Sequence, residues 1–521
     1  MCGFVCLWRV ADENLAEQMI GRIAHRGPDQ LTIYRPARVP AVLAHCRLAI
    51  IGPADGRQPL EADDTVLVAN GEIYNHADLR AILGQAAFET ASDSETILHL
   101  FRSDRLRWLS HLDGMFAFVL ATPERVIAAR DPLGIKPLYV ARVGEGLAFA
   151  SELKAFDGLG VESIETVPPG GLFDSRDGVR LWFRMTQGAA EPEPGFDAEA
   201  VAAELRLVLE EAVAKWMVAD VEVGSFLSGG LDSSIIAAVA AQSLARQPGK
   251  PRLKTFSVGL PGSPDLLAAR RVADHIGSEH FHLEFSAADL AAALPQVIYH
   301  LESADVDLVR SAVPTHFATT VARRQVKAVL TGEGADELFA GYAYHHDYAD
   351  RPRELADELT RSLRSMHNIN LQRVDRITMA QGLEARTPFL DRDLIDFAQT
   401  IPASVKLFVS PEQTSAPSPA GTESHPRPFG RVTTEKWILR KAVEDLLPAD
   451  LVWRKKAQFD EGTGTIDVLQ EALAIASGRA GPFSREDEAA IYEQILREQF
   501  TDPDMILAQA GAWADDRVEC G

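Results

Sequence analysis

The 521-residue sequence contains only four cysteines, Cys2, Cys6, Cys46 and Cys520, and they form no Cys-x-x-Cys pair. No histidine cluster has the spacing of zinc ligands, so a zinc site is not predicted. This cysteine usage fits a reducing cytoplasm. We expect Cys6 and Cys46 to be small residues of the core, because free cysteine is among the most buried residue types.

Long apolar runs are also missing. No window of about 20 uncharged apolar residues occurs, and the N-terminal MCGFVCLWRVADENL has no basic segment before a long apolar stretch. The sequence therefore predicts neither a membrane span nor a secretion signal, and we expect a cytoplasmic protein.

Basic side chains are outnumbered: 52 lysines and arginines face 75 acidic residues, which gives a formal net charge of −23. Such a charge repels phosphate backbones and anionic lipid, so neither nucleic acid nor a membrane surface is a predicted partner. Apolar residues make up 46% and charged residues 24%, as in ordinary globular proteins. The length exceeds what one hydrophobic core usually covers, so two or more domains are expected.

The apolar pattern changes along the chain. Residues 1–187 contain short apolar runs bounded by turn residues, which predicts a sheet-rich first domain. Residues 188–200 are rich in proline, glycine and acids and are predicted to be a linker. From 201 to 521, brief β-branched runs are followed by glycine-containing loops and helical sequence, which predicts a parallel, doubly wound sheet. The segment 410–431 is low in aliphatic residues and is predicted to be a flexible loop, either a tolerated insertion or a lid over the second site.

Cys2 becomes the first residue once the initiator methionine is removed, so that one residue carries a thiol and an α-amine. An α-amine titrates at about 7.7 to 8.0 and can take the thiol proton during attack and return it to a leaving amine. A cysteine at position 2 is weak evidence for a catalytic nucleophile by itself, so the assignment depends on the surrounding motifs.

Five further motifs follow in order within the sheet-rich half. They are AHRGPD (residues 24–29), HCRLAII (45–51), VANGEIYNH (68–76), SDSE (92–95) and RDPLGIKPLY (130–139). Together with Cys2 they resemble the glutaminase domain of the class II, N-terminal-nucleophile amidotransferases. This resemblance implies an αββα sandwich of antiparallel sheets.

The resemblance also implies roles for single residues. Cys2 would attack the amide carbon of glutamine, and Asn70 with the N–H of Gly71 would stabilise the oxyanion. Arg47 and Asp93 match the family residues that pair with the α-carboxylate and the α-ammonium of glutamine. The implied glutamine pocket comprises Arg47, Asn70, Gly71, Glu72 and Asp93.

A glycine-rich loop opens a helix after the predicted strand VEVGSFL. The loop, SGGLDSS (228–234), can bind phosphate through its N–H groups, its hydroxyls and the helix N-terminus. It is not a G-x-x-x-x-G-K-[ST] loop and resembles instead the loop of the ATP pyrophosphatases, which cleave ATP between the α- and β-phosphates. The implied ATP-binding residues are Leu227, Ser228, Gly229, Gly230, Asp232, Ser233, Ser234, Val258, Thr331, Gly332 and Glu333.

Further segments extend the resemblance to the glutamine-hydrolysing asparagine synthetases, from Cys2 to about Phe459. These are the residues 258–285, LTGEGADELFAGY (330–342), GLEARTPFLD (382–391), KWILRKA (436–442) and WRKKAQF (453–459). The family pattern implies that Asp232 and Asp336 hold Mg²⁺, that Glu333 lies where acceptor and ammonia meet, and that Lys456 stabilises the departing pyrophosphate.

The implied activity is that of a carbon–nitrogen ligase with glutamine as amide donor. Ammonia released at Cys2 would pass inside the protein to an acyl-adenylate formed from ATP, with aspartate as the first choice of acceptor. The expected T-Y-D-V-T-T-x-R segment reads SADVDLVR (303–310), so Arg310 is kept but Asp307 replaces a threonine and could repel a dicarboxylate. An amidotransferase of specialised metabolism acting on another carboxylate is the alternative. A binding module is disfavoured because nucleophile and phosphate loop are present, and the resemblance is compatible with a homodimer.

Overall fold

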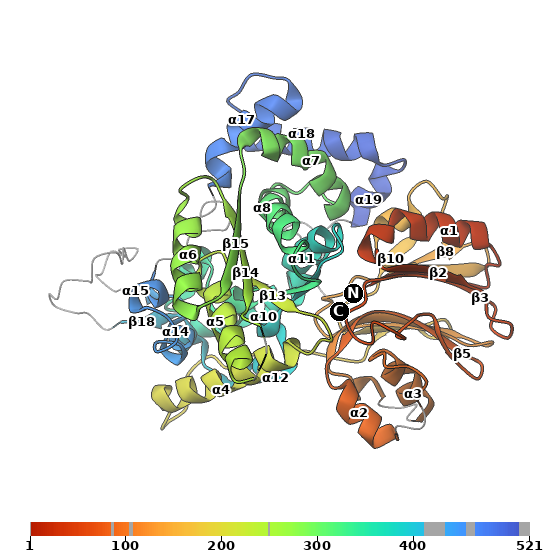
Figure 1. The fold of residues 1–521 in the computed structure, drawn as a ribbon, viewed down its shortest axis with the longest axis horizontal. Coiled ribbons are helices and arrows are strands. Elements are labelled where there is room, and N and C mark those ends of the chain that lie inside the picture. The colour runs from red at the N-terminus through yellow and green to blue at the C-terminus, as the bar shows by residue number, and fades with distance from the viewer. Residues whose placement is uncertain are drawn as a thin grey trace.

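A computed structural model describes residues 2–84, 88–103, 108–247, 249, 251–410, 433–454 and 464–509, which form two parts packed side by side (Figure 1). The predicted role of Lys456 and nearly all of the predicted loop 410–431 lie outside these residues. No helix in the described ranges is long and apolar enough to cross a membrane.

The N-terminal part is built on two six-stranded antiparallel sheets. The strand orders are β10-β8-β9-β1-β3-β2 and β12-β11-β7-β6-β5-β4. The strands are β1 (Cys2–Trp8), β2 (Gln30–Tyr34), β3 (Ala41–Arg47), β4 (Leu60–Ala62), β5 (Thr65–Ile73), β6 (Gly114–Ala121), β7 (Val126–Arg130), β8 (Tyr139–Val143), β9 (Gly146–Ala150), β10 (Ile164–Thr166), β11 (Gly171–Asp174) and β12 (Gly178–Leu181).

Alternation along β1 explains why the sheets stack in layers. Phe4 and Cys6 join the core between the two sheets, whereas Val5 and Leu7 pack toward helix α1 (Glu13–Arg22). Helices α2 (His76–Leu83) and α3 (Glu95–Ser103) cover the outer face of the second sheet (Figure 1). The part is therefore an αββα sandwich, which confirms the predicted fold, and Cys6 and Cys46 are buried as expected.

The C-terminal part alternates strands with helices. Its elements are α4 (Ala198–Trp216), β13 (Val223–Phe226), α5 (Leu231–Ala245), β14 (Lys254–Gly259), α6 (Pro264–Ile276), β15 (Glu279–Glu284), α7 (Ala287–Leu301), α8 (Val306–Ala322), β16 (Ala328–Leu330), α9 (Ala335–Phe339), α10 (Pro352–Ser365), α11 (Asn370–Met379), β17 (Glu384–Arg386), α12 (Arg392–Thr400), α13 (Ala403–Lys406), β18 (Phe408–Val409), β19 (Thr433–Thr434), α14 (Trp437–Ala442), α15 (Ala449–Val452), α17 (Thr465–Ser477), α18 (Arg485–Gln499) and α19 (Pro503–Gln509).

Five of these strands form a parallel sheet in the order β15-β14-β13-β16-β17. Helices α5 and α6 lie on one side of it and α8 and α11 on the other (Figure 1), so the predicted doubly wound fold is confirmed. The chain leaves β13 toward one edge through β14 and later returns beside it through β16. The carboxyl ends of β13 and β16 therefore border a crevice of the kind in which such sheets bind ligands.

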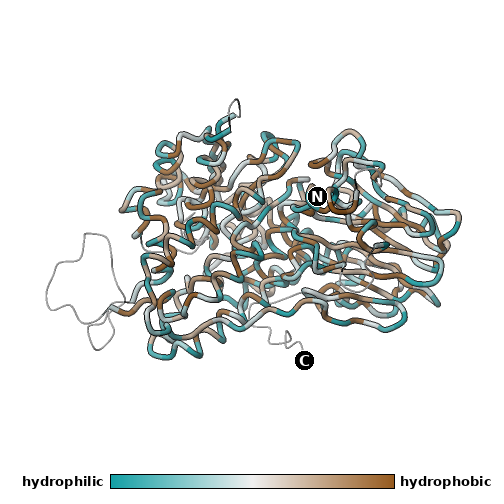
Figure 2. The backbone as a smooth tube through the Cα atoms, turned by 90° about the horizontal axis from the view of Figure 1, so that it is seen from below, coloured by the Kyte–Doolittle hydropathy of each residue, from teal (hydrophilic) through white to brown (hydrophobic). Residues whose placement is uncertain are grey.

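Residues 182–197, all of them described, form no helix or strand between β12 and α4. Within this stretch, Ala189 bonds through its N–H to the carbonyl of Gln399 (2.8 Å) and through its carbonyl to the N–H of Ala403 (2.9 Å). The stretch is thus held against α12 and α13, and the exact limits of the linker stay a prediction. Coloured by hydropathy, apolar segments run through the elements of both parts, while hydrophilic stretches occur at many outer turns (Figure 2).

Candidate active sites

Cys2 begins the central strand β1 and pairs in register with Arg47 at the end of β3. Its main-chain N–H donates to Oδ1 of Asn70 on β5 at 3.0 Å. Burial raises the pKa of the Cys2 thiol, against the opposing effects of the Leu48 N–H and of Arg47. A thiol with a raised pKa is mostly protonated near neutral pH, so attack on a carbonyl carbon requires a base that takes its proton.

Asn70 also has the donor that an oxyanion requires. Its side chain is fully buried, and Nδ2 has no hydrogen-bond partner among the described residues. The neighbouring Gly71 adopts φ +144°, and a Cβ there would meet the carbonyl oxygen of Met115 at 2.0 Å. Only glycine fits this close strand contact. A free buried donor beside a thiol is the arrangement that stabilises a developing negative charge.

Charges of both signs flank the thiol. Arg47 donates to the carbonyls of Gly52 (2.5 Å) and Pro53 (3.2 Å), and no ion pair of its guanidinium is found within the described residues. Asp93 accepts from the Ile73 N–H at 2.7 Å. Burial raises the pKa of both Asp93 and Glu72, and neighbouring carboxylates raise that of Glu72 further. A zwitterion with one carboxylate and one ammonium would complement this set.

The glycine-rich loop joins β13 to α5 as predicted. Ser228 and Ser233 contact each other through their hydroxyls at 3.0 Å, and the Ser234 hydroxyl donates to the Gly230 carbonyl at 2.7 Å. Gly230 is the N-cap of α5 and makes no side-chain cap bond, so the first N–H groups of this 15-residue helix face the loop. A Cβ on Gly332, from the loop after β16, would meet the Ser233 nitrogen at 2.8 Å. The two loops therefore lie in contact.

A cavity of about 580 Å³ opens at these two loops. All the predicted ATP-binding residues line it except Gly229 and Ser234. The Thr331 hydroxyl in its wall is buried and has no hydrogen-bond partner in the described part of the chain. The volume, the helix N-terminus and this free hydroxyl suit a nucleoside triphosphate.

Two acids meet beside the loop. Asp232 at the start of α5 and Asp336 on α9 each lie 2.6 Å from Nζ of Lys436, which is 2% exposed. Lys436 adopts φ +54°, a conformation that disfavours a side chain, at the N-cap of α14. Among the described residues, no group of three or more His, Cys, Asp or Glu side chains could hold a metal ion. Two carboxylates fit Mg²⁺ only where phosphate and water supply its other ligands.

Glu333 lines the same cavity. Its carboxylate accepts from Arg373 on α11 at 2.5 Å. Burial raises the pKa of Glu333, and Asp336 adds to this, while Arg373 lowers it. Glu333 therefore combines an anionic oxygen with a place beside the candidate phosphate site.

Comparison with known proteins identifies the family. The family model "Asparagine synthase" matches residues 204–360 and 348–517, and "Glutamine amidotransferase domain" matches residues 1–166. An asparagine synthetase [glutamine-hydrolyzing] of Oryza sativa subsp. japonica is 38% identical over 89% of this chain and 78% of its own length. One of Arabidopsis thaliana is 39% identical over 89% and 79%. The chain belongs to the glutamine-hydrolysing asparagine synthetase family.

A solved glutamine phosphoribosylpyrophosphate amidotransferase from B. subtilis shares 17% identity, with a TM-score of 0.32, over 55% of this chain and 82% of its own. This likeness is too low to support a comparison of sites.

Asp307 and Arg310, the predicted acceptor residues of this family member, lie on α8 and both contact α18. Asp307 lines the cavity and pairs with Arg485. Arg310 is not among the lining residues. Its guanidinium makes a bidentate interaction with the Glu488 carboxylate, with hydrogen bonds of 3.0 and 2.6 Å. Leu308 and Ser311 of the same helix also line the cavity. Their roles toward an acceptor stay predictions.

Many residues that line the cavity were not singled out in the sequence, and three of them are the cations Lys436, Arg373 and Arg454. Lys436 lies in the KWILRKA segment, which matched the family without a role for its lysine. Arg454 likewise lies in the matching WRKKAQF segment, which gave a role only to Lys456. Arg373 carried no local signal, because its partner Glu333 is distant in sequence; the partners of Arg454, Asp265 and the Gly229 carbonyl, are distant as well.

Proposed function

We propose that this chain is a glutamine-dependent, ATP-consuming asparagine synthetase with aspartate as acceptor. Membership of the family over 89% of the chain carries this proposal. The Cys2–Asn70 pair and the cavity at the glycine-rich loop support it, because each supplies one half of the reaction.

The first half takes place at Cys2. The sulfur attacks the side-chain amide carbon of glutamine, the thiol proton passes to the free α-amine, and Asn70 Nδ2 with the Gly71 N–H holds the oxyanion. Ammonia leaves with the returned proton, and water then hydrolyses the thioester to glutamate. Arg47 binds the α-carboxylate of glutamine and Asp93, with Glu72 nearby, its ammonium group.

The second half takes place in the cavity. The β-carboxylate of aspartate attacks the α-phosphorus of ATP and pyrophosphate leaves. Ammonia then attacks the acyl carbon, and AMP leaves as asparagine forms. Asp232 and Asp336 would hold Mg²⁺, which neutralises phosphate charge when bound, after Lys436 gives up its place between them. Glu333 faces the site of ammonia attack. Ammonia is mostly protonated in water near neutral pH, so it would pass between the sites inside the protein.

The test is incubation of the purified chain with glutamine, aspartate and Mg-ATP, with mass detection of asparagine, glutamate, AMP and pyrophosphate. Cys2→Ala should abolish synthesis from glutamine and keep synthesis from ammonium, since only the first site is lost. If no asparagine forms, but pyrophosphate is released when another carboxylate replaces aspartate, the chain is instead an amidotransferase of specialised metabolism. Normal turnover of glutamine by Cys2→Ala would refute the assigned nucleophile.

A further inference from the structure

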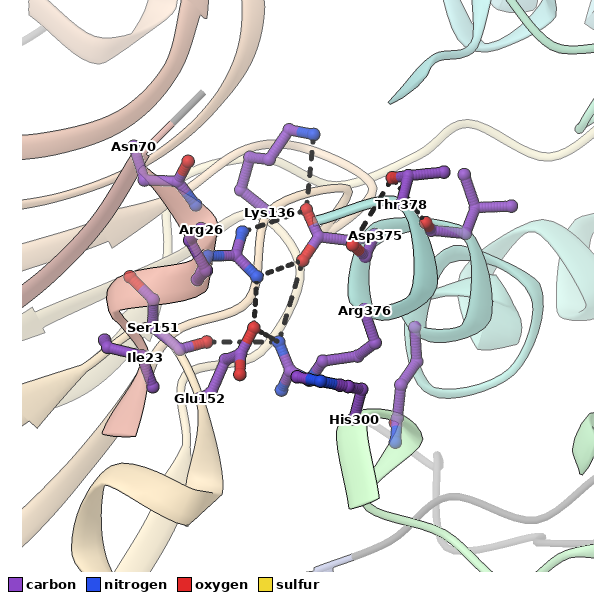
Figure 3. Close-up of polar contacts among 12 residues, drawn as sticks. Ile23, Arg26, Asn70, Lys136, Ser151, Glu152, His300, Asp375, Arg376 and Thr378 are labelled. Atoms are coloured by element: carbon purple, nitrogen blue, oxygen red, sulfur yellow. Dashed lines mark hydrogen bonds and ion pairs between the residues drawn. The ribbon is translucent and has the colours of Figure 1, made fainter. Parts of the chain in front are cut away.

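Helix α11 (Asn370–Met379) lies between the two candidate sites. Asn370, Arg373 and Val374 line the cavity of the C-terminal part, and Arg373 binds Glu333. Asp375 and Arg376, which follow directly, point into the N-terminal part (Figure 3). One ten-residue helix thus presents one face to each site.

Asp375 is connected to Cys2 through one side chain, that of Arg26. Its two oxygens accept from Nη1 and Nη2 of Arg26 at 2.8 and 3.2 Å. Nε of the same guanidinium donates to the carbonyl oxygen of Cys2 at 3.0 Å. The Arg26 side chain is fully buried and Asp375 is 3% exposed. The guanidinium is planar and rigid and is bound along two edges, so a shift of Asp375 at one edge moves the Nε–H that binds the Cys2 carbonyl.

The surroundings make Asp375 difficult to replace as a partner of Arg26. Glu152 of the N-terminal part also accepts from Arg26, at 2.5 Å, but it is shared with Lys154. Lys136 adds a second cation beside Asp375 at 3.4 Å. Burial alone would raise the pKa of Asp375, but Arg26 and Lys136 outweigh it and lower the pKa. Asp375 is therefore an ionised carboxylate that the C-terminal part inserts among cations of the N-terminal part.

We propose that Asp375 is a positioning residue for the Cys2 nucleophile, and that α11 transmits occupancy of the ATP cavity to the glutaminase site. This inference rests on the proposed function. Binding of phosphate, acceptor or Mg²⁺ near Glu333 changes the charge around Arg373. Because Arg373 belongs to α11, this change shifts the position of the helix. Arg26 then shifts the carbonyl of Cys2 relative to Asn70, whose oxygen holds the Cys2 nitrogen.

The test follows the reactivity of Cys2 without requiring turnover. The full chain is alkylated with iodoacetamide, with and without Mg-ATP, and modification of the Cys2 peptide is timed by mass spectrometry. Mg-ATP should change the wild-type rate at least about threefold. Asp375→Asn, which keeps the shape and removes the charge, should respond by less than about 1.3-fold. Asp375→Glu keeps the charge but lengthens the side chain, so its alkylation rate should change less with Mg-ATP than that of the wild type. This variant serves as the test if Asp375→Asn does not fold.

Lys327→Gln is the matched control. Lys327 makes another ion pair between the two parts, with Asp29 at 2.6 Å, on the surface and without contact to Cys2. It should respond to Mg-ATP like the wild type. An equal response in Asp375→Asn and the wild type, or no wild-type response, would overturn the inference. The proposed function can fail separately. If Mg-ATP changes the alkylation rate of Cys2 but the chain makes no asparagine, the role of Asp375 stands and the proposed function is refuted.

Discussion

Asn70 allows the glutaminase site to be tested at one side chain. Its Oδ1 accepts from the Cys2 nitrogen at 3.0 Å, while its buried Nδ2 has no partner within the described residues. Asn70→Ala removes both groups. Loss of one oxyanion donor costs about 10²- to 10³-fold in kcat, or about 2.7 to 4 kcal/mol of transition-state stabilisation. Loss of the acceptor adds about 1 to 3 kcal/mol of instability, because the Cys2 nitrogen is left unpaired in a buried place.

Asn70→Asp separates the two contributions. It keeps the acceptor for the Cys2 nitrogen and places a second oxygen where the donor was, so glutaminase activity should fall at least 10²-fold, while the buried carboxylate itself costs some stability. The assay is glutamate release from glutamine, with urea unfolding for stability and ammonium-dependent asparagine synthesis as the internal control. Glutamate release within threefold of wild type in Asn70→Asp would show that Asn70 only positions Cys2, and the oxyanion assignment would be wrong.

Three further changes test other parts of the molecule. Asp336→Asn should lower pyrophosphate release at least 10²-fold while glutamate release persists, and ADP with phosphate as wild-type products would contradict the role of the loop. Asp307→Thr removes a half-exposed ion pair worth at most about 1 kcal/mol, so asparagine synthesis should stay within threefold, and a tenfold loss would make Asp307 part of acceptor recognition. Burial lowers the pKa of Lys406 from 10.5 to about 7, so the folded protein loses stability as pH falls from 10.5 to 7. Lys406→Met should raise the free energy of unfolding at pH 7 by up to about 5 kcal/mol, with the gain vanishing above pH 10.5 in urea unfolding, and a gain independent of pH would exclude this cause.

The local motifs predicted the parts of the sites that are contiguous in sequence. SGGLDSS forms one turn between a strand and a helix. Cys2 on β1 and Asn70 on β5 contact each other from the two facing sheets, and each lies within a motif that also contains its strand. Strands β13, β14 and β16 were predicted from apolar β-branched runs. Strands β15 and β17 were not, because β15 carries polar residues at an edge of the sheet and β17 has three residues.

The partners of charged residues could not be predicted in the same way. Arg310 binds Glu488, 178 positions away, and Arg26 binds Asp375, 349 positions away. A charged residue in a sequence is usually a surface residue, and no periodicity indicates that another part of the chain will cover it. Sequence reasoning therefore placed Arg310 toward the acceptor, whereas its contact with α18 depends on tertiary packing.

The buried charges between the two parts also limit how such a protein can be produced. Arg26, Lys136 and Glu152 come from one part, and Asp375 and Arg376 from the other. Cutting the chain between the parts and making each half alone would leave these groups without their partners. A charge that stays buried without its partner costs about 3 to 5 kcal/mol, and less where water reaches it. Each half expressed alone should therefore be less stable than in the joined chain, so joining them in one polypeptide serves stability as well as the proposed ammonia transfer.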